Sequence, residues 1–413
     1  MPGGPLEGIT VVDLTSVVVG PLCTQILADH GAEVIKVESP SGDLVRNLNG
    51  KSPTPAMGAK FLHLNRNKRS VVLDLKQPAA FSALTKLVER ADVLVWNMRP
   101  AAMKRLKLSY EDVRRLNPKI VYCGMFGFGQ DGRYRNKPAF DTIIQGASGM
   151  AGIFERSGSR PRTVPLVAAD KTVGLVAVQM IVMALYRRTQ TGEGCAIEIP
   201  MFENFVKYVM EEHMYLRTFD PPLGGTCDPR LIDPRAGPIQ TKDSYICISA
   251  TTTDQAFALF DAIGKPELKN DPRFSTPSAR FANVKDYYAC RTEALKEKTT
   301  AEWLEIFDKA DIPAMPYHTP DTILDDPHLT DIGFFEWRQH PTEGKIRMMR
   351  LPNKWSCGTR EDWNPAPKLG QQSVDVLTEI GLTQGEIDAM VESGATIDGR
   401  LKPTVKQHGS TRK

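Results

Sequence analysis

Residues 9–38 have the sequence ITVVDLTSVVVGPLCTQILADHGAEVIKVE. The β-branched run over 9–14 predicts a buried strand, and residues 21–30 predict a helix that begins with proline. Gly31 ends this helix, and residues 32–38 predict a second strand. A strand, a helix and a second strand in this order are typical of two parallel strands joined by a helical crossover.

The same alternation continues along the first half of the chain. Further strands are expected over 71–75, 92–96, 120–124 and 195–199, and further helices over 78–91 and 170–188. Alternating strands and helices imply a parallel sheet that is covered by helices on both faces. The sequence therefore predicts an α/β fold with an open, doubly wound, Rossmann-like sheet.

A second, smaller domain is expected, because 413 residues are more than one hydrophobic core usually holds. The proline- and glycine-rich residues 221–225 predict a linker. After it, a strand is expected over 245–250, with helices over 253–263, 284–296 and 300–309. We therefore assign residues 221–330 to a small α+β domain with its linker. The basic tail, 400–413, is predicted to be disordered.

The composition argues against several classes of protein. The net charge is only +3, and no basic run is interleaved with aromatic residues, so no nucleic-acid partner is expected. The seven Cys and seven His are dispersed without CxxC or metal-ligand spacing, which favours reduced thiols and no metal site. No signal peptide is apparent, and no apolar run reaches about 18 residues. We expect a cytoplasmic protein without a membrane segment.

Residues 127–132, GFGQDG, match the GxGxxG pattern of dinucleotide-binding proteins. That fingerprint also needs a helix that begins at the last glycine and an acidic residue about 20 positions later. Residues 133–138, RYRNKP, make a poor start for a helix. We therefore reject a nicotinamide site and interpret the glycines as a loop at the carboxyl end of a strand, where open α/β sheets bind ligands.

Several segments match one protein family when their order and spacing are considered together. They are GITVVDLT (8–15) followed by Gly20 and Pro21, GAEVIKVE (31–38), LNRNKRS (64–70), LDLK (73–76), NMRP (97–100), GFGQ (127–130), Ala169 with Asp170, and RTQTGEG (188–194). Over roughly residues 6–399 the chain resembles the class III CoA-transferases. This family includes formyl-CoA and carnitine CoA-transferases and the α-methylacyl-CoA racemases.

The resemblance implies how the whole molecule is organised. Residues 1–220 and 331–399 would together form the large, CoA-binding domain, with the small domain inserted between them. Two subunits would interlock as an obligate homodimer. A coenzyme A thioester would be a substrate, and no cofactor would be bound permanently.

Asp170 directly precedes the long apolar helix. From the residues alone, an aspartate at this position is an ordinary helix N-cap. The family, however, has its catalytic aspartate here. A helix N-terminus favours the ionised carboxylate, which is the form that a nucleophile needs.

The resemblance also implies a covalent route for the reaction. The aspartate attacks an acyl-CoA to form an anhydride, and CoA thiolate then converts that anhydride into an aspartyl-CoA thioester. The acceptor acid runs the same steps in reverse. Each tetrahedral step needs oxyanion donors, for which backbone N–H groups near the glycine loop are candidates.

By similarity, nine residues fall at positions that contact coenzyme A. They are Val17, Val18, Leu73, Lys76, Asn97, Met98, Arg105, Lys137 and Met201. Arginine suits phosphates because its planar fork binds them through two hydrogen bonds. For the basic residues a solvated charged face is the alternative, and for Met201 a place in the core. Lys137 is the weakest candidate, because its spacing to Phe140 differs by one from that in formyl-CoA transferases.

The chain departs from formyl-CoA transferases at several positions. Ser16 and Val18 replace a histidine and a glutamine, and Ser39 replaces an arginine. Residues 233–237, DPRAG, contain one glycine where those enzymes have a glycine-rich lid. The oxalate and formate pair is therefore not expected, and the lid chemistry does not carry over.

The racemase branch needs a histidine where this chain has Phe140, directly before Asp141. A 1,1-proton transfer requires two bases on opposite faces of the α-carbon, and phenylalanine accepts no proton. A transferase is therefore favoured over a racemase. Transfer of CoA within a single diacid and a non-catalytic acyl-CoA-binding protein stay open as alternatives.

The donor and the acceptor are not determined by these motifs. Succinyl-CoA is a candidate donor, and a carboxylic acid, in first place a dicarboxylic one, is the candidate acceptor. Arg230 and Arg235 are candidates to bind a distal carboxylate; the alternative is a polar interdomain loop.

Overall fold

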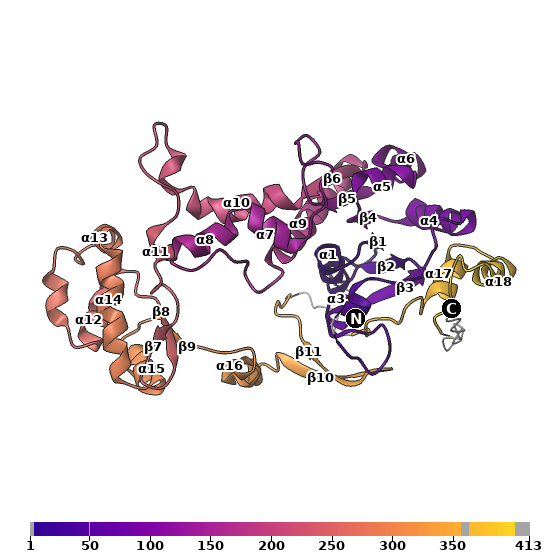
Figure 1. Cartoon of the computed structure of the whole chain (residues 1–413). Helices are drawn as coiled ribbons and strands as arrows, with labels where there is room; N and C mark the ends of the chain where they lie inside the picture. The colour runs from indigo at the N-terminus through magenta and orange to yellow at the C-terminus, as the bar shows by residue number, and fades with distance from the viewer. Residues whose placement is uncertain (1–3, 49, 357–362, 401–413) are drawn as a thin grey trace, which may run out of the picture. The chain divides into compact units, whose positions relative to one another are not determined.

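A computed structural model describes residues 4–48, 50–356 and 363–400 of the chain (Figure 1). The chain divides into two compact units. The larger unit contains residues 1–145, 165–206 and 333–413, and the smaller unit contains residues 146–164 and 207–332. The predicted disordered tail, 400–413, lies outside the described residues except for Arg400.

The larger unit is built on a six-stranded parallel sheet. Its order is β3-β2-β1-β4-β5-β6, formed by β1 (Thr10–Leu14), β2 (Glu33–Glu38), β3 (Lys68–Val72), β4 (Val93–Trp96), β5 (Val121–Phe126) and β6 (Cys195–Pro200). The chain runs outward from β1 to β3, returns to β4 beside β1, and then runs outward in the other direction. This is the strand order of a Rossmann-like sheet, so the predicted α/β fold is confirmed.

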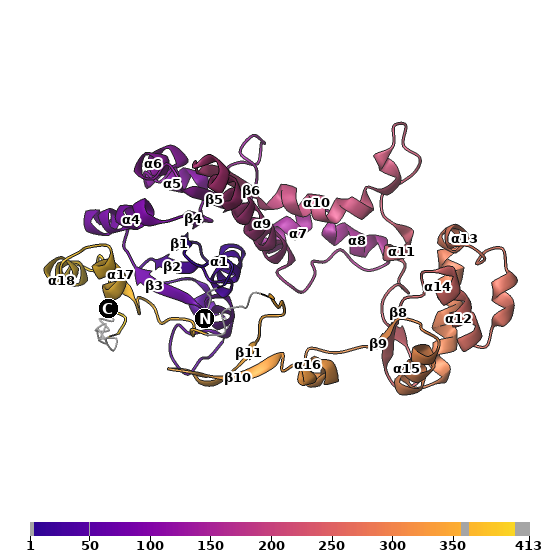
Figure 2. The same cartoon turned by 180° about the vertical axis from the view of Figure 1, so that it is seen from behind.

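Helices cover both faces of this sheet. On one face, α4 (Pro78–Arg90), α17 (Ser373–Glu379) and α18 (Gln384–Glu392) share a hydrophobic core with the strands. On the other face, α1 (Val19–Asp29) packs against α9 (Ala168–Thr191). Helix α17 lies beside β3 in both views (Figures 1 and 2). The two ends of the chain therefore build one core.

Helix α9 is long and apolar enough to cross a membrane by length and composition alone. It contacts α1, β5 and β6, which is the packing of a core helix in a Rossmann-like unit.

The other elements that begin in the larger unit are short or lie at its margin. They are α2 (Val45–Leu48), α3 (Ala59–Leu64), α5 (Pro100–Arg105), α6 (Tyr110–Leu116), α7 (Asp141–Ala147), α10 (Met201–His213) and the antiparallel pair β10 (Phe335–His340) and β11 (Gly344–Met349).

The smaller unit has a core of its own. Its antiparallel sheet has the order β7-β8-β9 and consists of β7 (Ile239–Gln240), β8 (Tyr245–Ile248) and β9 (Ala314–Pro316). Its helices are α8 (Met150–Arg156), α11 (Pro229–Ile232), α12 (Thr253–Ala262), α13 (Pro277–Ala282), α14 (Val284–Ala294), α15 (Thr300–Lys309) and α16 (Pro327–Asp331), with 3-10 turns η1 (Tyr215–Thr218), η2 (Pro266–Asn270), η3 (Leu295–Glu297) and η4 (Thr322–Asp325). Phe260, Phe274, Trp303 and Phe307 are buried in this core.

The boundary between the units differs from the predicted one at 220/221. It lies within α10, between residues 206 and 207, because this helix begins directly after β6 and continues to His213. The chain thus leaves the larger unit along a helix, and not through the expected linker, 221–225. Residues 146–164 also belong to the smaller unit, where α8 contacts α11.

Candidate active site

The loops that follow four parallel strands meet at one edge of the sheet. Ligands of such sheets bind beyond the carboxyl ends of the strands, where the strand order reverses, and here that place lies between β1 and β4. The loops enclose a cavity of about 130 Å³. It is lined by residues 16–19 after β1, Asn97 after β4, residues 125–127 at the end of β5, Ala139 with Phe140, Asp170, and Met201 after β6.

The loop after β1 is joined directly to the end of β4. The N–H of Ser16 donates to Asn97 Oδ1 at 3.0 Å, and Asn97 Nδ2 donates to the carbonyl of Ser16 at 2.8 Å. Val17 has a φ of 71°, in the left-handed region that β-branched residues rarely adopt. Its N–H donates to Asp43 Oδ1 at 3.1 Å, which holds this conformation. Strain of this kind is often found where a loop must present backbone to a ligand.

Two buried ion pairs beneath this loop explain three of the sequence motifs. Lys36 lies 2.9 Å from Asp43, and its ammonium group also donates to the carbonyl of Thr15 at 2.8 Å. Lys68 lies 3.2 Å from Asp13. Burial alone would raise the pKa of Asp13, but the ammonium groups of Lys68 and Lys36 lower it to about 2. The pairs therefore fix the loop that lines the cavity.

Asp170 lies in the first turn of α9, so it is not the N-cap of that helix. The N-cap is Val167, which makes no side-chain capping bond. Asp141 supplies the missing acceptor, because its Oδ1 accepts the backbone N–H of Asp170 at 3.1 Å. Gln145, one turn further along α7, donates to the other carboxylate oxygen of Asp141 at 2.6 Å. A side chain from a second helix thus caps α9.

The surroundings of Asp170 disfavour its ionised form. Burial raises its pKa, the nearby charge of Asp141 raises it further, and Lys60 opposes both, so that the pKa is about 7. The favourable effect of the helix N-terminus, expected from the sequence, is outweighed. The carboxyl group of Asp170 consequently changes its protonation state near neutral pH.

Comparison with known proteins decides the family. Residues 6–373 match the model of CoA-transferase family III. The chain belongs to this family.

Relatives and solved structures agree with this assignment. The transferase is 30% identical over 394 residues to succinyl-CoA:glutarate CoA-transferase of Mus musculus, which covers 94% of this chain and 90% of the relative. It is 31% identical over 428 residues to formyl-CoA:oxalate CoA-transferase of Bradyrhizobium diazoefficiens, covering 97% and 98%. A CAIB/BAIF family protein from Brucella suis matches with a TM-score of 0.74 and 28% identity, covering 92% and 100%. The predicted enzyme class, a CoA-transferase that acts on coenzyme A thioesters, is confirmed.

The structure brings together five of the ten residues predicted for the site of the transferase. Val17, Val18, Asn97, Asp170 and Met201 all line the cavity. Three of them come from loops at the carboxyl ends of β1 and β4, and Met201 is the first residue of α10. They come from distant parts of the chain, and the parallel sheet is what unites them.

The other five predicted residues lie outside the cavity. Leu73 is buried directly after β3, which ends at Val72 instead of the predicted residue 75. Met98 is half-buried against the core of the sheet. Lys76, Arg105 and Lys137 are exposed, and the ammonium group of Lys137 lies over the ring of Tyr134 at 4.4 Å.

The glycine loop after β5 is shaped by close contacts. A Cβ atom on Gly127 would lie 2.5 Å from the Cβ of Ala139, and both residues line the cavity. The N–H of Gly129 donates to Glu203 Oε1 at 2.8 Å, so a ligand would have to compete for it. Gly129 is therefore a poor oxyanion donor.

The two arginines considered for a distal carboxylate lie in the smaller unit. Arg230 forms an ion pair with Asp228 at 2.7 Å, and Arg235 forms one with Asp233 at 2.8 Å. In both cases the partner is two residues earlier, and the charge of the arginine is compensated locally.

The residues that position Asp170 and shift its pKa were not predicted from the sequence. Asp141 and Gln145 act together on its backbone, and Lys60 acts on its charge. The i, i+4 spacing of Asp141 and Gln145 was the one available signal, since residues at this spacing share a helix face.

Proposed function

We propose that Asp170 is the covalent nucleophile of this transferase. We also propose that the enzyme moves CoA from an acyl-CoA, in first place succinyl-CoA, to a dicarboxylic acid. The observation that carries the proposal concerns the cavity at the carboxyl edge of the sheet. Among the described residues that line it, Asp170 is the one titratable side chain. A carboxylate is the nucleophile that such an exchange needs, because one acid replaces another.

Each step of the proposed route forms and breaks one bond to an acyl carbon. The Asp170 carboxylate attacks the thioester carbon of succinyl-CoA, the C–S bond breaks, and CoA leaves as a thiolate. The thiolate attacks the aspartyl carbonyl of the anhydride, which releases succinate and leaves an aspartyl-CoA thioester. The acceptor carboxylate displaces CoA from this thioester, and the thiolate then attacks the acyl carbon of the acceptor, which regenerates Asp170.

The residues at the sheet edge support a proposed site for CoA. Leu73 and Lys76 would meet the adenine and phosphates, and Asn97, Met98 and Arg105 would contact the rest of the nucleotide end. Their positions after β3 and β4 support this, since both strands end on the side of the sheet where the cavity opens. Val17, Val18 and Met201 would contact the thioester end, and Lys137 is a further phosphate candidate.

Glutarate is the acceptor that we propose to test first. The mouse relative is named for succinyl-CoA and glutarate. The relative named for formyl-CoA and oxalate is similarly close, but this chain has Ser16 and Val18 where formyl-CoA transferases have a histidine and a glutamine. Both residues line the cavity. Serine and valine are smaller side chains than histidine and glutamine. They therefore suit a longer diacid better than oxalate.

The racemase alternative has less support. Proton transfer at an α-carbon needs a second base opposite the first. Phe140 lines the cavity at the critical position, and Asp141 behind it is engaged with the N–H of Asp170 and with Gln145. No second base among the described residues therefore faces the cavity.

We further propose that the transferase is an interlocked homodimer. Leu175, Val182, Met183 and Tyr186 lie on one face of α9 and are 40–67% exposed. A second copy of the chain would cover this apolar face, whose exposure is unusual for a core helix. Six cysteines in the described residues are free, in keeping with a reducing, cytoplasmic location.

The experiment that tests the function follows an isotopic label. The enzyme is incubated with succinyl-CoA and carbon-13-labelled glutarate, and the products are analysed by mass spectrometry. Labelled glutaryl-CoA is expected, whereas transfer within one diacid would leave the label in free glutarate. Asp170→Asn should lose activity by about a thousandfold or more. Asp254→Asn, which changes an exposed aspartate in the first turn of α12, should not.

Wild-type activity in Asp170→Asn would overturn the proposal that Asp170 is the nucleophile. A wider panel of labelled diacids extends the test. If none of them is converted into its labelled CoA ester, the proposal of intermolecular transfer is wrong.

A further inference from the structure

The smaller unit contains a larger cavity than the one at Asp170. Its volume is about 360 Å³, within the range of small-molecule sites in proteins. Residues from β8, α11, α13 and α14 line it, and each of them belongs to the smaller unit. The proposed CoA transfer takes place at the cavity that contains Asp170 and does not involve this second cavity.

The lining of this cavity is strongly basic. Among the described residues that line it are three arginines, Arg230, Arg280 and Arg291, and no carboxylate. Arg230 is paired with Asp228, which lies outside the lining. Arg280 is buried and donates to neutral acceptors, among them the carbonyl of Phe274 at 2.8 Å. After the ion pair of Arg230 with Asp228 is counted, the net charge of these side chains is still positive by more than one unit.

Arg291 is the residue that points to a ligand. It is only 5% exposed, and within the part of the chain that the structure describes its Nε has no hydrogen-bond partner. Its guanidinium group stacks over the ring of Tyr288 at 4.0 Å, and one Nη donates weakly to the carbonyl of Arg235 at 3.4 Å. A buried guanidinium without a carboxylate partner is costly unless an anion completes the site.

Burial also makes the positive charge of Arg291 less favourable. It lowers the pKa of Arg291, whereas hydrogen bonds to carboxylates raise the pKa values of Arg230 and Arg235. The charge of Asp233 acts in the opposite direction on the pKa of Arg291, but this carboxylate is already paired with Arg235.

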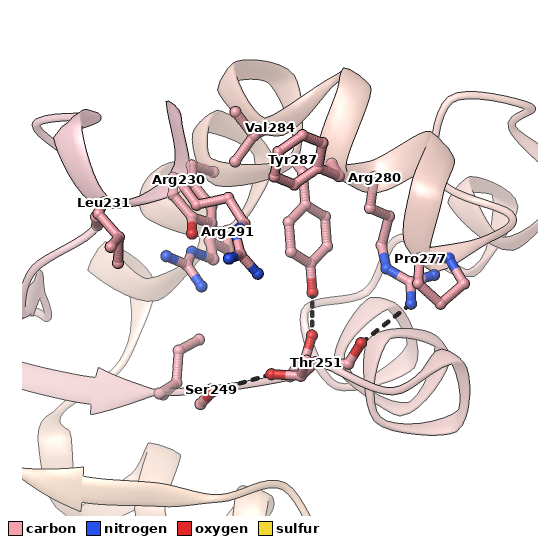
Figure 3. Close-up of a pocket in the computed structure, with 14 residues that line it drawn as sticks. Arg230, Leu231, Ser249, Thr251, Pro277, Arg280, Val284, Tyr287 and Arg291 are labelled. Atoms are coloured by element: carbon pink, nitrogen blue, oxygen red, sulfur yellow. Dashed lines mark hydrogen bonds between the residues drawn. The ribbon is translucent and has the colours of Figure 1, made fainter. Parts of the chain in front are cut away.

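Hydroxyl groups and apolar side chains complete the cavity. Ser249 and Thr251 lie on the wall opposite the guanidinium groups of Arg230 and Arg291 (Figure 3). Tyr287 donates to the carbonyl of Ala250 and so holds that wall in place. Leu231 and Phe281 add apolar surface.

We propose that this cavity is a binding site for a small organic oxyanion. The ligand carries a carboxylate or phosphate group that Arg291 binds through its free Nε–H, and a short apolar or aromatic body that lies against Tyr288 and Phe281. Arginine is suited to such groups because its N–H donors match the spacing of two anionic oxygens. This site does not rest on the proposed CoA transfer.

The test measures binding to the full-length protein by isothermal titration calorimetry. The probes are benzoate as the carboxylate, inorganic phosphate as the phosphate, and benzamide as a neutral analogue of benzoate. At least one anion should bind with a stoichiometry of one per chain, and benzamide should not. The identity of the tightest anion distinguishes a carboxylate ligand from a phosphate ligand. Asp170→Ala should bind equally well, which separates this site from the proposed active site.

The matched variants are Arg291→Met and Arg273→Met. Arg273 lies in the same unit, is paired with Asp271 and packs over Phe274, but does not line the cavity. Arg291→Met should weaken binding by about tenfold or more, and Arg273→Met should leave it unchanged. If Arg291→Met does not fold, Arg291→Lys replaces it, with the same direction expected. Saturable binding by none of the anions, or equal binding by the Arg291 variant, would overturn the proposal.

Discussion

The carboxylate of Asp141 accepts a hydrogen bond from the backbone N–H of Asp170, with 3.1 Å between the nitrogen and Oδ1. The contact satisfies an N–H group that the first turn of α9 leaves without a partner in the helix. It also places a second negative charge beside the nucleophile that we propose, which raises the pKa of Asp170 in addition to burial. One interaction thus both positions the carboxylate and restrains its ionisation.

The first prediction concerns the pH dependence of the reaction of Asp170 with succinyl-CoA. Its pKa is about 7, and only the ionised form attacks. The rate of adduct formation should therefore rise by about tenfold per pH unit well below the pKa, and it should level off above about pH 8. Rapid-quench mass spectrometry over this range measures it. A rate that does not change between about pH 5 and pH 8 would show that the carboxylate is ionised throughout.

The second prediction concerns stability. Because the pKa of Asp170 in the folded state, about 7, lies above the ordinary value of 3.8 for an aspartate, the folded state binds the proton more tightly. The stability of the wild type should then fall as the pH rises from about 4 to about 7. Asp170→Asn lacks this loss and should be more stable by up to about 4 kcal/mol above pH 8, but not near pH 4.

Calorimetric unfolding at equal protein concentrations checks the second prediction. Asp254→Asn is the control, because that aspartate also lies in the first turn of a helix but is exposed. A variant of Asp170 that is equally stabilised at both pH values would contradict the proposed cause.

The third prediction concerns the buried pair beneath the loop after β1. Lys36→Met leaves the carboxylate of Asp43 buried without its cation, which should cost about 3–5 kcal/mol of unfolding free energy. Lys309→Met breaks an ion pair with Glu305 in which both side chains are over 70% exposed, and should change stability by less than about 0.5 kcal/mol. Urea unfolding of both variants is the measurement. Similar losses in the two would mean that burial of the pair does not matter.

The fourth prediction concerns the loop after β5. In Gly127→Ala the added Cβ would lie 2.5 Å from the Cβ of Ala139, so the loop must move at the cavity wall. We expect transfer activity to fall by about a hundredfold while the protein stays folded, since small displacements of reacting groups are costly. Gly385→Ala, where the added atom meets no atom of the described residues within 4 Å, is the control. Full activity of Gly127→Ala would show that this wall does not shape the site.

The sheet was predictable because its strands are local signals. β1 and β2 are short runs rich in β-branched residues, and the order of strands and helices along the chain left few topologies open. Boundaries were less accurate where turns or continuous helices competed with that pattern. Thus β3 ends at Val72, because Gln77 and Asp74 form a turn directly afterwards. The boundary between the units falls inside α10, which ends at His213, before the linker that was expected at 221–225.

The environment of Asp170 was not predictable, because it depends on contacts between distant segments. Its neighbours Asp141 and Lys60 are brought close by the fold. The helix also begins earlier than an aspartate cap would predict, since Ala168 and Ala169 are strong helix formers. A local rule therefore assigned Asp170 a capping role that Asp141 fulfils.

We propose that Asp170 carries CoA covalently during transfer. The most direct test of this proposal is mass spectrometry of proteolytic fragments after incubation with succinyl-CoA and an acid quench. The added mass of CoA should be found on the peptide that contains Asp170, and it should be absent in Asp170→Ala. Rapid transfer of CoA to glutarate by a wild-type enzyme that never carries this adduct would contradict it.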